Sequence, residues 1–202
     1  AKKLKLILSP STGIDHLDIS EIKKRKIKYV TITNEIKLLN TFTATSELAF
    51  ALILNLYRKI FLANRFTLKG IWAREKFTGN QLYNKTIGIL GMGRLGKITA
   101  KIASGFGMKV LGCDIKKKKI KNIKMVSVKK LFNTSDIISI HIHLNKKTTG
   151  LVNQKLFKQM KKNSILINTS RGGIINENDL IYALKNNLIA GPEAPKFNFS
   201  KL

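Results

Sequence analysis

The sequence predicts an α/β fold in which helices cover both faces of a doubly wound parallel sheet. From residue 85 onward, short apolar runs that suit buried strands alternate with segments that suit helices. A glycine-rich turn joins the first of these strands to the helix that follows it. At 202 residues, the chain is long enough to bury the core of one such domain, with a fragment of another.

The expected elements of this region follow in order along the chain. Strands are predicted at 86–90, 108–112, 125–126, 137–142 and 164–168. Helices are predicted from residue 94, and at 128–132, 154–160 and 178–186. Ligands bind where the strands of a parallel sheet end. The turns after residues 90, 112, 142 and 168 should therefore share one crevice.

The first 84 residues are less regular. Residues 5–9 predict a buried strand, and 29–33 predict a second strand after a lysine-rich loop. Residues 43–59 predict a long apolar helix capped by Thr45 or Ser46, with Glu47 in its first turn. Such a helix should be buried against a sheet or against a partner subunit. Residues 66–83 show no clean periodicity and predict a connecting segment.

The run Gly91-Met-Gly-Arg-Leu-Gly96 has the glycine spacing of a dinucleotide-binding turn. Gly91 allows the tight turn out of the strand, and Gly93 lets the backbone approach a pyrophosphate. Gly96 lets the helix pack closely on the sheet. The motif stands between a predicted strand and a predicted helix, which is the Rossmann-type context that gives it meaning.

The groups around this turn indicate which ligand it holds. The free N–H groups near Arg94 and Leu95 would face phosphates at the positive end of the helix dipole. Asp114, about 20 residues further on, can accept hydrogen bonds from both hydroxyls of an adenosine ribose and would repel a 2′-phosphate. The motif therefore predicts NAD; another cofactor held by a similar fold, such as a methyl donor, is the alternative.

Arg171 follows the last predicted strand, in the run Asn168-Thr-Ser-Arg-Gly-Gly173. A guanidinium at that edge can clamp a carboxylate and polarise an adjacent carbonyl oxygen. Nicotinamide cofactors deliver hydride to carbonyl carbons, so this cation suits their chemistry. The alternative is an arginine with no role on a surface loop. His141 ends the preceding strand; we interpret it as a structural residue bonded to a backbone group, with proton donation as the alternative.

Composition narrows the class of protein. The net charge of +27 comes from lysines spread along the whole chain, with no interleaved aromatics and no helix-turn-helix or zinc pattern, so we expect neither specific nucleic-acid binding nor a metal site. The longest apolar run is about half the length that a bilayer requires. The single cysteine, Cys113, suits a reducing compartment, and we expect a cytoplasmic protein.

Three stretches resemble the D-isomer-specific 2-hydroxyacid dehydrogenase family: residues 79–96, 105–110 and 156–173. The resemblance implies an NAD-binding Rossmann domain at 41–202 and, at 1–40, the C-terminal part of a flavodoxin-like substrate domain. Residues 43–54 resemble the family's long helix, which helps to form a homodimer. The implied reaction is hydride transfer between NAD(H) and a 2-keto or D-2-hydroxy acid.

The resemblance also implies roles for individual residues. Arg171 would be the catalytic, substrate-binding arginine, and the loop at Thr12 and Gly13 would hold the substrate carboxylate. The cofactor would lie against Gly91, Gly93, Arg94, Leu95, Gly96, Asp114, Ile142, His143, Thr148, Thr169, Ser170 and Arg171, with Ile142, His143 and Thr148 on its adenine and ribose side and Thr169 and Ser170 on its nicotinamide half.

The end of the sequence departs from the family pattern. The Pro-His segment that carries the family's acid/base histidine does not occur, and Glu193 is a poor substitute for it. We therefore expect a chain truncated at both ends that binds NAD weakly or not at all and turns over negligibly; reduction of a 2-keto acid at an ordinary rate would contradict this. A non-catalytic NAD-binding regulatory or interaction protein on the same fold is the alternative, and a nucleic-acid-binding protein is a third hypothesis that rests on charge alone.

Overall fold

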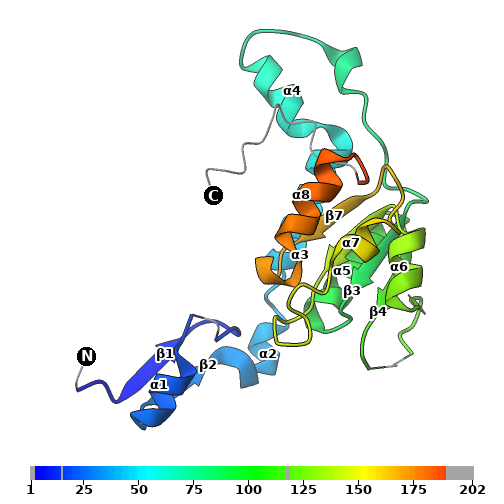
Figure 1. Ribbon diagram of the computed structural model, residues 1–202. Coiled ribbons are helices and arrows are strands. Elements are labelled where there is room, and N and C mark those ends of the chain that lie inside the picture. The colour runs from blue at the N-terminus through cyan, green and yellow to red at the C-terminus, as the bar shows by residue number, and fades with distance from the viewer. Residues whose placement is uncertain (1–2, 15, 117–118, 190–202) are drawn as a thin grey trace. The chain divides into compact units, whose positions relative to one another are not determined.

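The computed structural model describes residues 3–14, 16–116 and 119–189. The chain forms two compact units, unit 1 (Ala1–Thr43) and unit 2 (Ala44–Leu202). Figure 1 shows the elements of both, and each unit is described by itself.

Unit 1 contains a two-stranded parallel sheet of β1 (Leu6–Ser9) and β2 (Lys28–Thr31). The strand predicted at 5–9 is present, but the prediction that it is buried was wrong: Leu8 is 70% exposed, because the small sheet leaves that face uncovered. The expected lysine-rich loop was also wrong in part, since it contains α1 (Ile19–Lys24). Asp18 caps this helix by accepting a hydrogen bond from the N–H of Glu21 at 3.0 Å. Two short elements complete the unit, η1 (Ile32–Asn34) and α2 (Ile36–Leu39).

Unit 2 is built on a five-stranded sheet in the order β5-β4-β3-β6-β7, and every neighbouring pair of strands is parallel. The strands are β3 (Thr86–Leu90), β4 (Lys109–Cys113), β5 (Lys124–Met125), β6 (Ile137–Ile140) and β7 (Ile165–Asn168). The chain order reverses its direction across the sheet between β3 and β6. This confirms the predicted parallel α/β sheet; in open sheets of this kind, ligands bind at the carboxyl ends of the strands beside such a reversal.

The helices of unit 2 cover both faces of this sheet (Figure 1). The helices of the unit are α3 (Ala44–Arg58), α4 (Ile60–Thr67), α5 (Arg94–Gly105), α6 (Val128–Thr134), α7 (Gln154–Phe157) and α8 (Glu177–Lys185), with short 3-10 helices η2 (Arg74–Phe77) and η3 (Gly172–Ile174). Of these, α4 packs against α3 and η2 and extends away from the sheet (Figure 1). On one face, α3 and α5 pack on Ile87 and Ile89. On the other face, α6, α7 and α8 pack on Ile138 and Ile140.

The first long helix, predicted at 43–59, is confirmed as α3, but its predicted cap was wrong. The helix begins at Ala44, so Thr45 and Ser46 lie inside its first turn and do not cap it. It ends at Arg58, because Lys59 adopts a left-handed conformation (φ 52°) that separates it from α4. Part of the predicted connecting segment is thus helical. Of α3, only one face is buried, through Ser46 and the apolar residues Ala49, Phe50 and Ile53.

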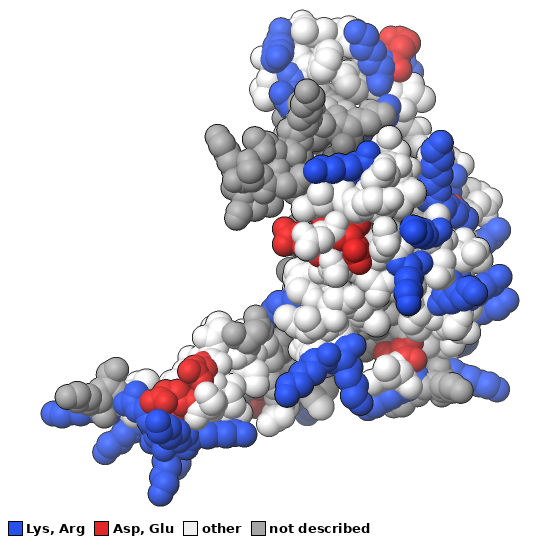
Figure 2. Space-filling view, in the orientation of Figure 1, with Lys and Arg blue, Asp and Glu red and all other residues white. Residues whose placement is uncertain are grey.

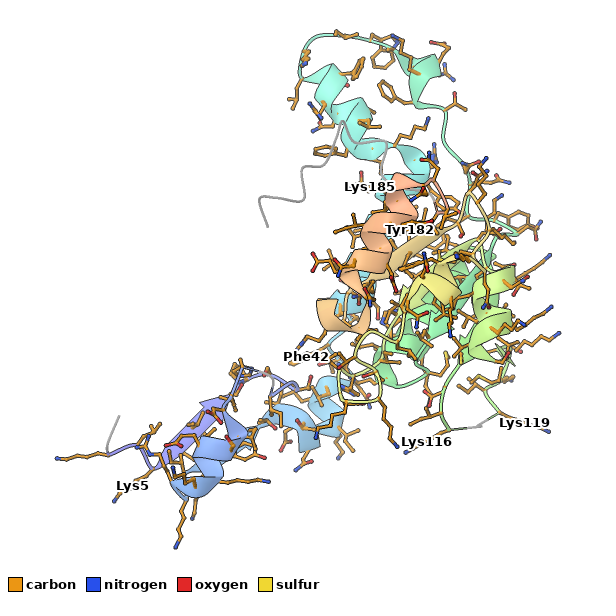
Figure 3. The ribbon with its side chains drawn as sticks, viewed as in Figure 1. Lys5, Phe42, Lys116, Lys119, Tyr182 and Lys185 are labelled. Atoms are coloured by element: carbon orange, nitrogen blue, oxygen red, sulfur yellow. The ribbon has the colours of Figure 1, made fainter. Side chains whose placement is uncertain are left out.

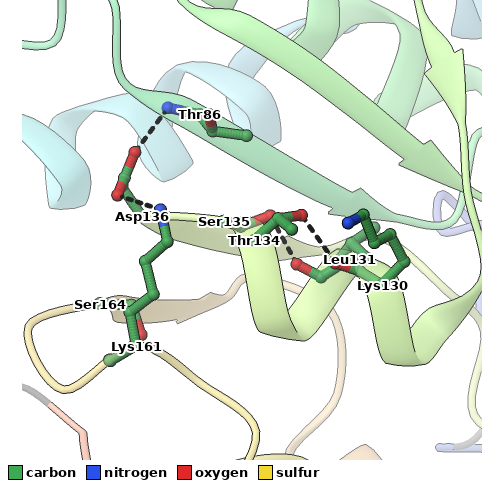
Figure 4. Close-up of polar contacts among 8 residues, drawn as sticks. All are labelled: Thr86, Lys130, Leu131, Thr134, Ser135, Asp136, Lys161 and Ser164. Atoms are coloured by element: carbon green, nitrogen blue, oxygen red, sulfur yellow. Dashed lines mark hydrogen bonds and ion pairs between the residues drawn. The ribbon is translucent and has the colours of Figure 1, made fainter.

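Asp136 ties the strands β3 and β6 together at the edge where they begin (Figure 4). Its carboxylate accepts hydrogen bonds from the N–H of Thr86 and from the ammonium group of Lys161, both at 2.8 Å. Burial opposes the charged form, but these donors hold the pKa of the Asp136 carboxyl below its ordinary value of 3.8. The carboxylate therefore bridges the first residue of β3 and Lys161 at this edge of the sheet.

Lysine and arginine side chains are spread over the visible face of the protein without gathering at one place (Figure 2). The densest run follows β4, where Lys116 and Lys119 lie on an exposed loop (Figure 3). Across the part of the chain that the structure describes, no helix has the length and apolarity to cross a bilayer.

Candidate functional site

The glycine turn lies between β3 and α5 and is held by both neighbouring strands. The N–H of Gly91 donates to the carbonyl of Cys113 at the end of β4, at 2.8 Å, and the N–H of His141 donates to the carbonyl of Leu90, at 2.7 Å. Gly91 has φ 99°, and a Cβ there would collide with the carbonyl oxygen of His141. A side chain is excluded at this position by conformation and by space.

Gly96 and Gly93 differ in what surrounds them. A Cβ on Gly96 would collide with the carbonyl oxygen of Gly91, so this glycine permits the close approach of α5 to the turn. A Cβ on Gly93 would meet none of the described atoms within 4 Å, and Gly93 has an ordinary negative φ of −71°. Packing of the free protein therefore does not require glycine at residue 93. The open space beside it, at the N-terminus of the 12-residue helix α5, fits a pyrophosphate that approaches the backbone.

Asp114 stands directly after β4 and reaches this turn. Its carboxylate accepts hydrogen bonds from the N–H of Met92 at 2.7 Å and from the N–H of Lys116 at 3.0 Å. The carboxylate is half-buried and keeps lone pairs for further donors. The predicted ribose-binding acid is thus beside the predicted phosphate-binding turn.

The segment after β6 carries the next group of predicted site residues. Ile142 is half-buried and His143 is exposed. The hydroxyl of Thr148 donates to the carbonyl of His143 at 2.7 Å and accepts from the N–H of Asn145 at 2.8 Å. These bonds fold the loop back on itself, so Thr148 lies next to His143.

The segment after β7 carries the last group of predicted site residues. The hydroxyl of Ser170 donates to the carbonyl of Ile140 at 2.8 Å, which joins this turn to the end of β6. Asn168 shapes the turn through its side chain, which accepts from the N–H of Ser170 and donates to the carbonyl of Arg171, both at 3.0 Å. Arg171 is exposed, and its guanidinium donates to the carbonyl of Ser170 at 3.2 Å.

Thr169 also lies in the segment after β7. Its hydroxyl oxygen is buried and has no hydrogen-bond partner among the residues that the structure describes. A buried hydroxyl without a partner is costly, so it fits a site that a polar ligand completes. Together with the open space at Gly93 and the carboxylate of Asp114, it makes the residues present a fit for a dinucleotide.

His141 is half-buried next to the glycine turn, where its ring nitrogen Nε2 lies 2.8 Å from the hydroxyl of Ser139 and 3.2 Å from that of Thr99. The structural role expected for it is supported, but its partners are hydroxyls and not the expected backbone group. Burial lowers the pKa of His141 to about 4, so the ring is neutral at neutral pH and is a poor proton donor.

The sequence predicted no role in the site for two residues near His141, which are Ser46 on α3 and Thr99 on α5. Both are fully buried. In the sequence, each of them places a hydroxyl at an otherwise apolar position of a helix, which is the signal that could have found them. Ser46 was predicted to be a helix cap instead.

Thr12 and Gly13 lie in unit 1, in the turn after β1. The carbonyl of Thr12 accepts a hydrogen bond from the hydroxyl of Thr33 at 3.3 Å, and that of Gly13 accepts from the hydroxyl of Ser11 at 2.6 Å. The carbonyls of both residues are therefore engaged within unit 1.

Comparison with known proteins places these motifs in a wider group. Residues 50–193 match the model of the D-isomer specific 2-hydroxyacid dehydrogenase, NAD binding domain. The chain is 41% identical over 202 residues to glyoxylate reductase of Thermococcus litoralis, covering 95% of this chain and 60% of that protein. It is 37% identical over 194 residues to D-3-phosphoglycerate dehydrogenase of Archaeoglobus fulgidus, covering 94% and 36%.

The fold is shared with solved structures of similar proteins. The D-lactate dehydrogenase of Aquifex aeolicus, solved in complex with NAD and lactic acid, superposes with a TM-score of 0.81 at 30% identity, covering 93% of this chain and 56% of that one. The chain thus spans 60% or less of the length of these three relatives.

Proposed function

We propose that this chain, which belongs to the D-isomer-specific 2-hydroxyacid dehydrogenase family, forms the NAD-binding part of an oxidoreductase. The oxidoreductase would act on the CH–OH group of D-2-hydroxy acids. The observation that carries this proposal is the meeting of three strand ends around an open glycine turn, with Arg171 at the same edge. Bound NAD(H) supplies the hydride that is exchanged with the carbonyl carbon of a 2-keto acid.

The residues of unit 2 would hold the cofactor in three groups. The N–H groups near Arg94 and Leu95 bind the pyrophosphate over Gly91, Gly93 and Gly96. Asp114 accepts hydrogen bonds from the adenosine ribose, beside Ile142, His143 and Thr148. Thr169 and Ser170 lie along the nicotinamide half, where a polar group of the cofactor would satisfy the buried hydroxyl of Thr169.

Arg171 is the proposed catalytic residue. Its guanidinium would bind the substrate carboxylate through paired hydrogen bonds and would polarise the neighbouring carbonyl oxygen, on which negative charge develops as hydride arrives. We propose that unit 1 is part of the substrate domain and that the N–H groups at Thr12 and Gly13 in that unit bind a substrate carboxylate.

Binding measurements test these roles. Titration with NADH, followed by its fluorescence, should show binding to the purified chain, and glyoxylate should bind to the NADH-saturated protein. Arg171→Gln should weaken glyoxylate binding by about 10- to 100-fold, because it removes charge-assisted hydrogen bonds worth about 1.5–3 kcal/mol. Lys185→Gln, which removes an exposed positive charge from α8, is the matched control (Figure 3).

The outcomes of this experiment are separable. Absence of NADH binding to the wild-type chain contradicts the cofactor assignment. Equal glyoxylate affinity in Arg171→Gln and in the wild type contradicts the role of Arg171 but leaves the cofactor assignment in place.

The second copy of the chain is the proposed protein partner, in the cytoplasm. The side of α3 and α4 that does not face the sheet exposes Leu48, Ile60 and Phe61, and the following segment exposes Trp72, which is 86% accessible. Clusters of exposed apolar side chains are typical of an interface between subunits. Sedimentation should show a dimer that Phe61→Asp dissociates and that Tyr182→Asp, an equal change on α8, leaves intact; a monomeric wild-type chain would contradict the proposal.

A further inference from the structure

A chain of hydrogen bonds through the buried residues Thr99 and Ser46 runs from the end of β6 to the first turn of α5. His141 Nε2 lies 3.2 Å from Thr99 Oγ1, Thr99 Oγ1 donates to Ser46 Oγ at 3.0 Å, and Ser46 Oγ donates to the carbonyl oxygen of Leu95 at 3.2 Å. Ser139 Oγ lies 2.8 Å from the same ring nitrogen. Three hydroxyls are fully buried, those of Ser46, Thr99 and Ser139.

The number of protons fixes the direction of this chain. Ser46 gives its only hydroxyl proton to Leu95, so it accepts from Thr99. Thr99 gives its only proton to Ser46, so its oxygen accepts from the ring of His141. The proton of the neutral ring is therefore on Nε2, and Ser139 shares it as a second acceptor.

The other ring nitrogen agrees with this assignment. His141 Nδ1 is buried and has no partner within the described part of the chain. In the assigned tautomer Nδ1 is a bare acceptor and not an N–H. Burial, which lowers the pKa of His141 to about 4, keeps the ring in this neutral form.

The carbonyl at the end of the chain belongs to the turn that would face the cofactor. Leu95 is the second residue of α5, and in a regular helix its carbonyl also takes the N–H of residue 99. The backbone of His141 contacts the same turn from the other side, through its bond to Leu90 and its carbonyl against Gly91. His141 thus holds the turn directly through its backbone, and indirectly through the hydroxyls of Thr99 and Ser46, which connect its ring to the carbonyl of Leu95.

We infer that Ser46, Thr99 and His141 are positioning residues that hold the N-terminal turn of α5 in the geometry that binds a diphosphate. None of the three would touch the cofactor. The inference rests on the proposed NAD site, because it assigns to that site supporting residues as far away as α3.

Variants of Thr99 test the inference. Thr99→Val keeps the shape but removes the hydroxyl, and should weaken NAD binding about tenfold, which corresponds to about 1.4 kcal/mol. Adenosine, which carries no phosphate, should bind Thr99→Val as it binds the wild type, to within about twofold. Thr99→Ser should restore NAD affinity. Ser104→Ala, which removes a hydroxyl bonded only within α5 to Ala100, is the matched control and should bind NAD normally.

Amide hydrogen exchange provides a measurement that does not need the cofactor. The amide of Lys97, which bonds to the carbonyl of Gly93, should exchange about tenfold faster in Thr99→Val, and so should that of Ile98, while the amides of β3 keep their rates. If Thr99→Val does not fold, Ser46→Ala combined with Thr99→Val removes both hydroxyls together and should show the same changes.

Each outcome decides a specific point. Unchanged exchange at Lys97 and Ile98 overturns the inference, whether or not NAD binds. Equal weakening of NAD and adenosine also overturns it, because the hydroxyl then supports the whole unit and not the diphosphate turn. If the wild-type chain does not bind NAD while exchange still accelerates in the variant, the proposed function fails and the support of the turn remains.

Discussion

Replacement of Gly96 by alanine should destabilise unit 2, because the new methyl group enters a contact between two backbone segments. Its Cβ would collide with the carbonyl oxygen of Gly91 and lie 3.0 Å from the carbon of that carbonyl. The Gly91 backbone has little freedom to yield, since its N–H is bonded to β4 and its Cα faces the carbonyl of His141.

The magnitude follows from two opposing effects. Forcing a methyl group into a packed contact costs about 1–3 kcal/mol, and we expect the upper part of this range because the neighbour is backbone. The better helix propensity of alanine returns up to about 1 kcal/mol. The expected net loss is about 2 kcal/mol, which lowers the melting temperature by about 4–8 °C for a chain of this size.

Gly105 provides a matched control in the same helix. A Cβ there would meet none of the described atoms within 4 Å, so Gly105→Ala should stabilise the protein by about 0.4–1 kcal/mol. Urea and thermal unfolding followed by circular dichroism measure both variants. The reasoning is refuted if the two substitutions shift stability in the same direction, or if Gly96→Ala unfolds together with the wild type.

Three further predictions concern charge and the cofactor. Asp136→Asn should cost about 1 kcal/mol at pH 7, as measured by urea unfolding. The pKa of Asp136 is lower in the folded state than in the unfolded state, so the carboxylate stabilises the fold above the unfolded pKa near 4 and loses this effect as pH falls through the folded pKa. The difference in stability between variant and wild type should therefore shrink below about pH 4. A difference that stays constant with pH would contradict this. Asp114→Asn keeps an acceptor for Met92 but loses the charge, so the preference for NAD over NADP in calorimetric titrations should fall about tenfold; an unchanged preference would assign the discrimination elsewhere. Gly93→Ala should change stability by no more than about 1 kcal/mol yet weaken NAD at least tenfold, and a variant with normal NAD affinity would show that the cofactor does not approach this backbone.

The parallel sheet could be predicted because its pattern is local. Buried parallel strands consist of short continuous apolar runs, and Thr86–Leu90 is followed at once by the glycines that turn the chain. The meeting of Asp114 with the glycine turn was also predictable, since both follow strands that end at one edge of the sheet.

The remaining features depend on tertiary contacts. Leu8 has the sequence of a buried strand residue, but its burial depends on what covers the sheet. The end of α3 was predicted to within one residue, whereas α4, which begins directly after the left-handed Lys59, was not predicted. Ser46 has the residue type of a helix cap, and only the approach of α5 shows that it bonds to Leu95 instead.

The pairing of β3 with β6 also has a consequence for the order of folding. Thr86 and Asp136, whose hydrogen bond joins these strands, are 50 residues apart, whereas β3, α5 and β4 are consecutive. Local closure is entropically cheaper, so we expect the β3-α5-β4 segment to form before β6 docks. The backbone of His141 arrives with β6, and only then is the glycine turn complete. Acquisition of cofactor affinity during refolding should therefore lag behind the appearance of helix, and its rate would report the docking of this central strand.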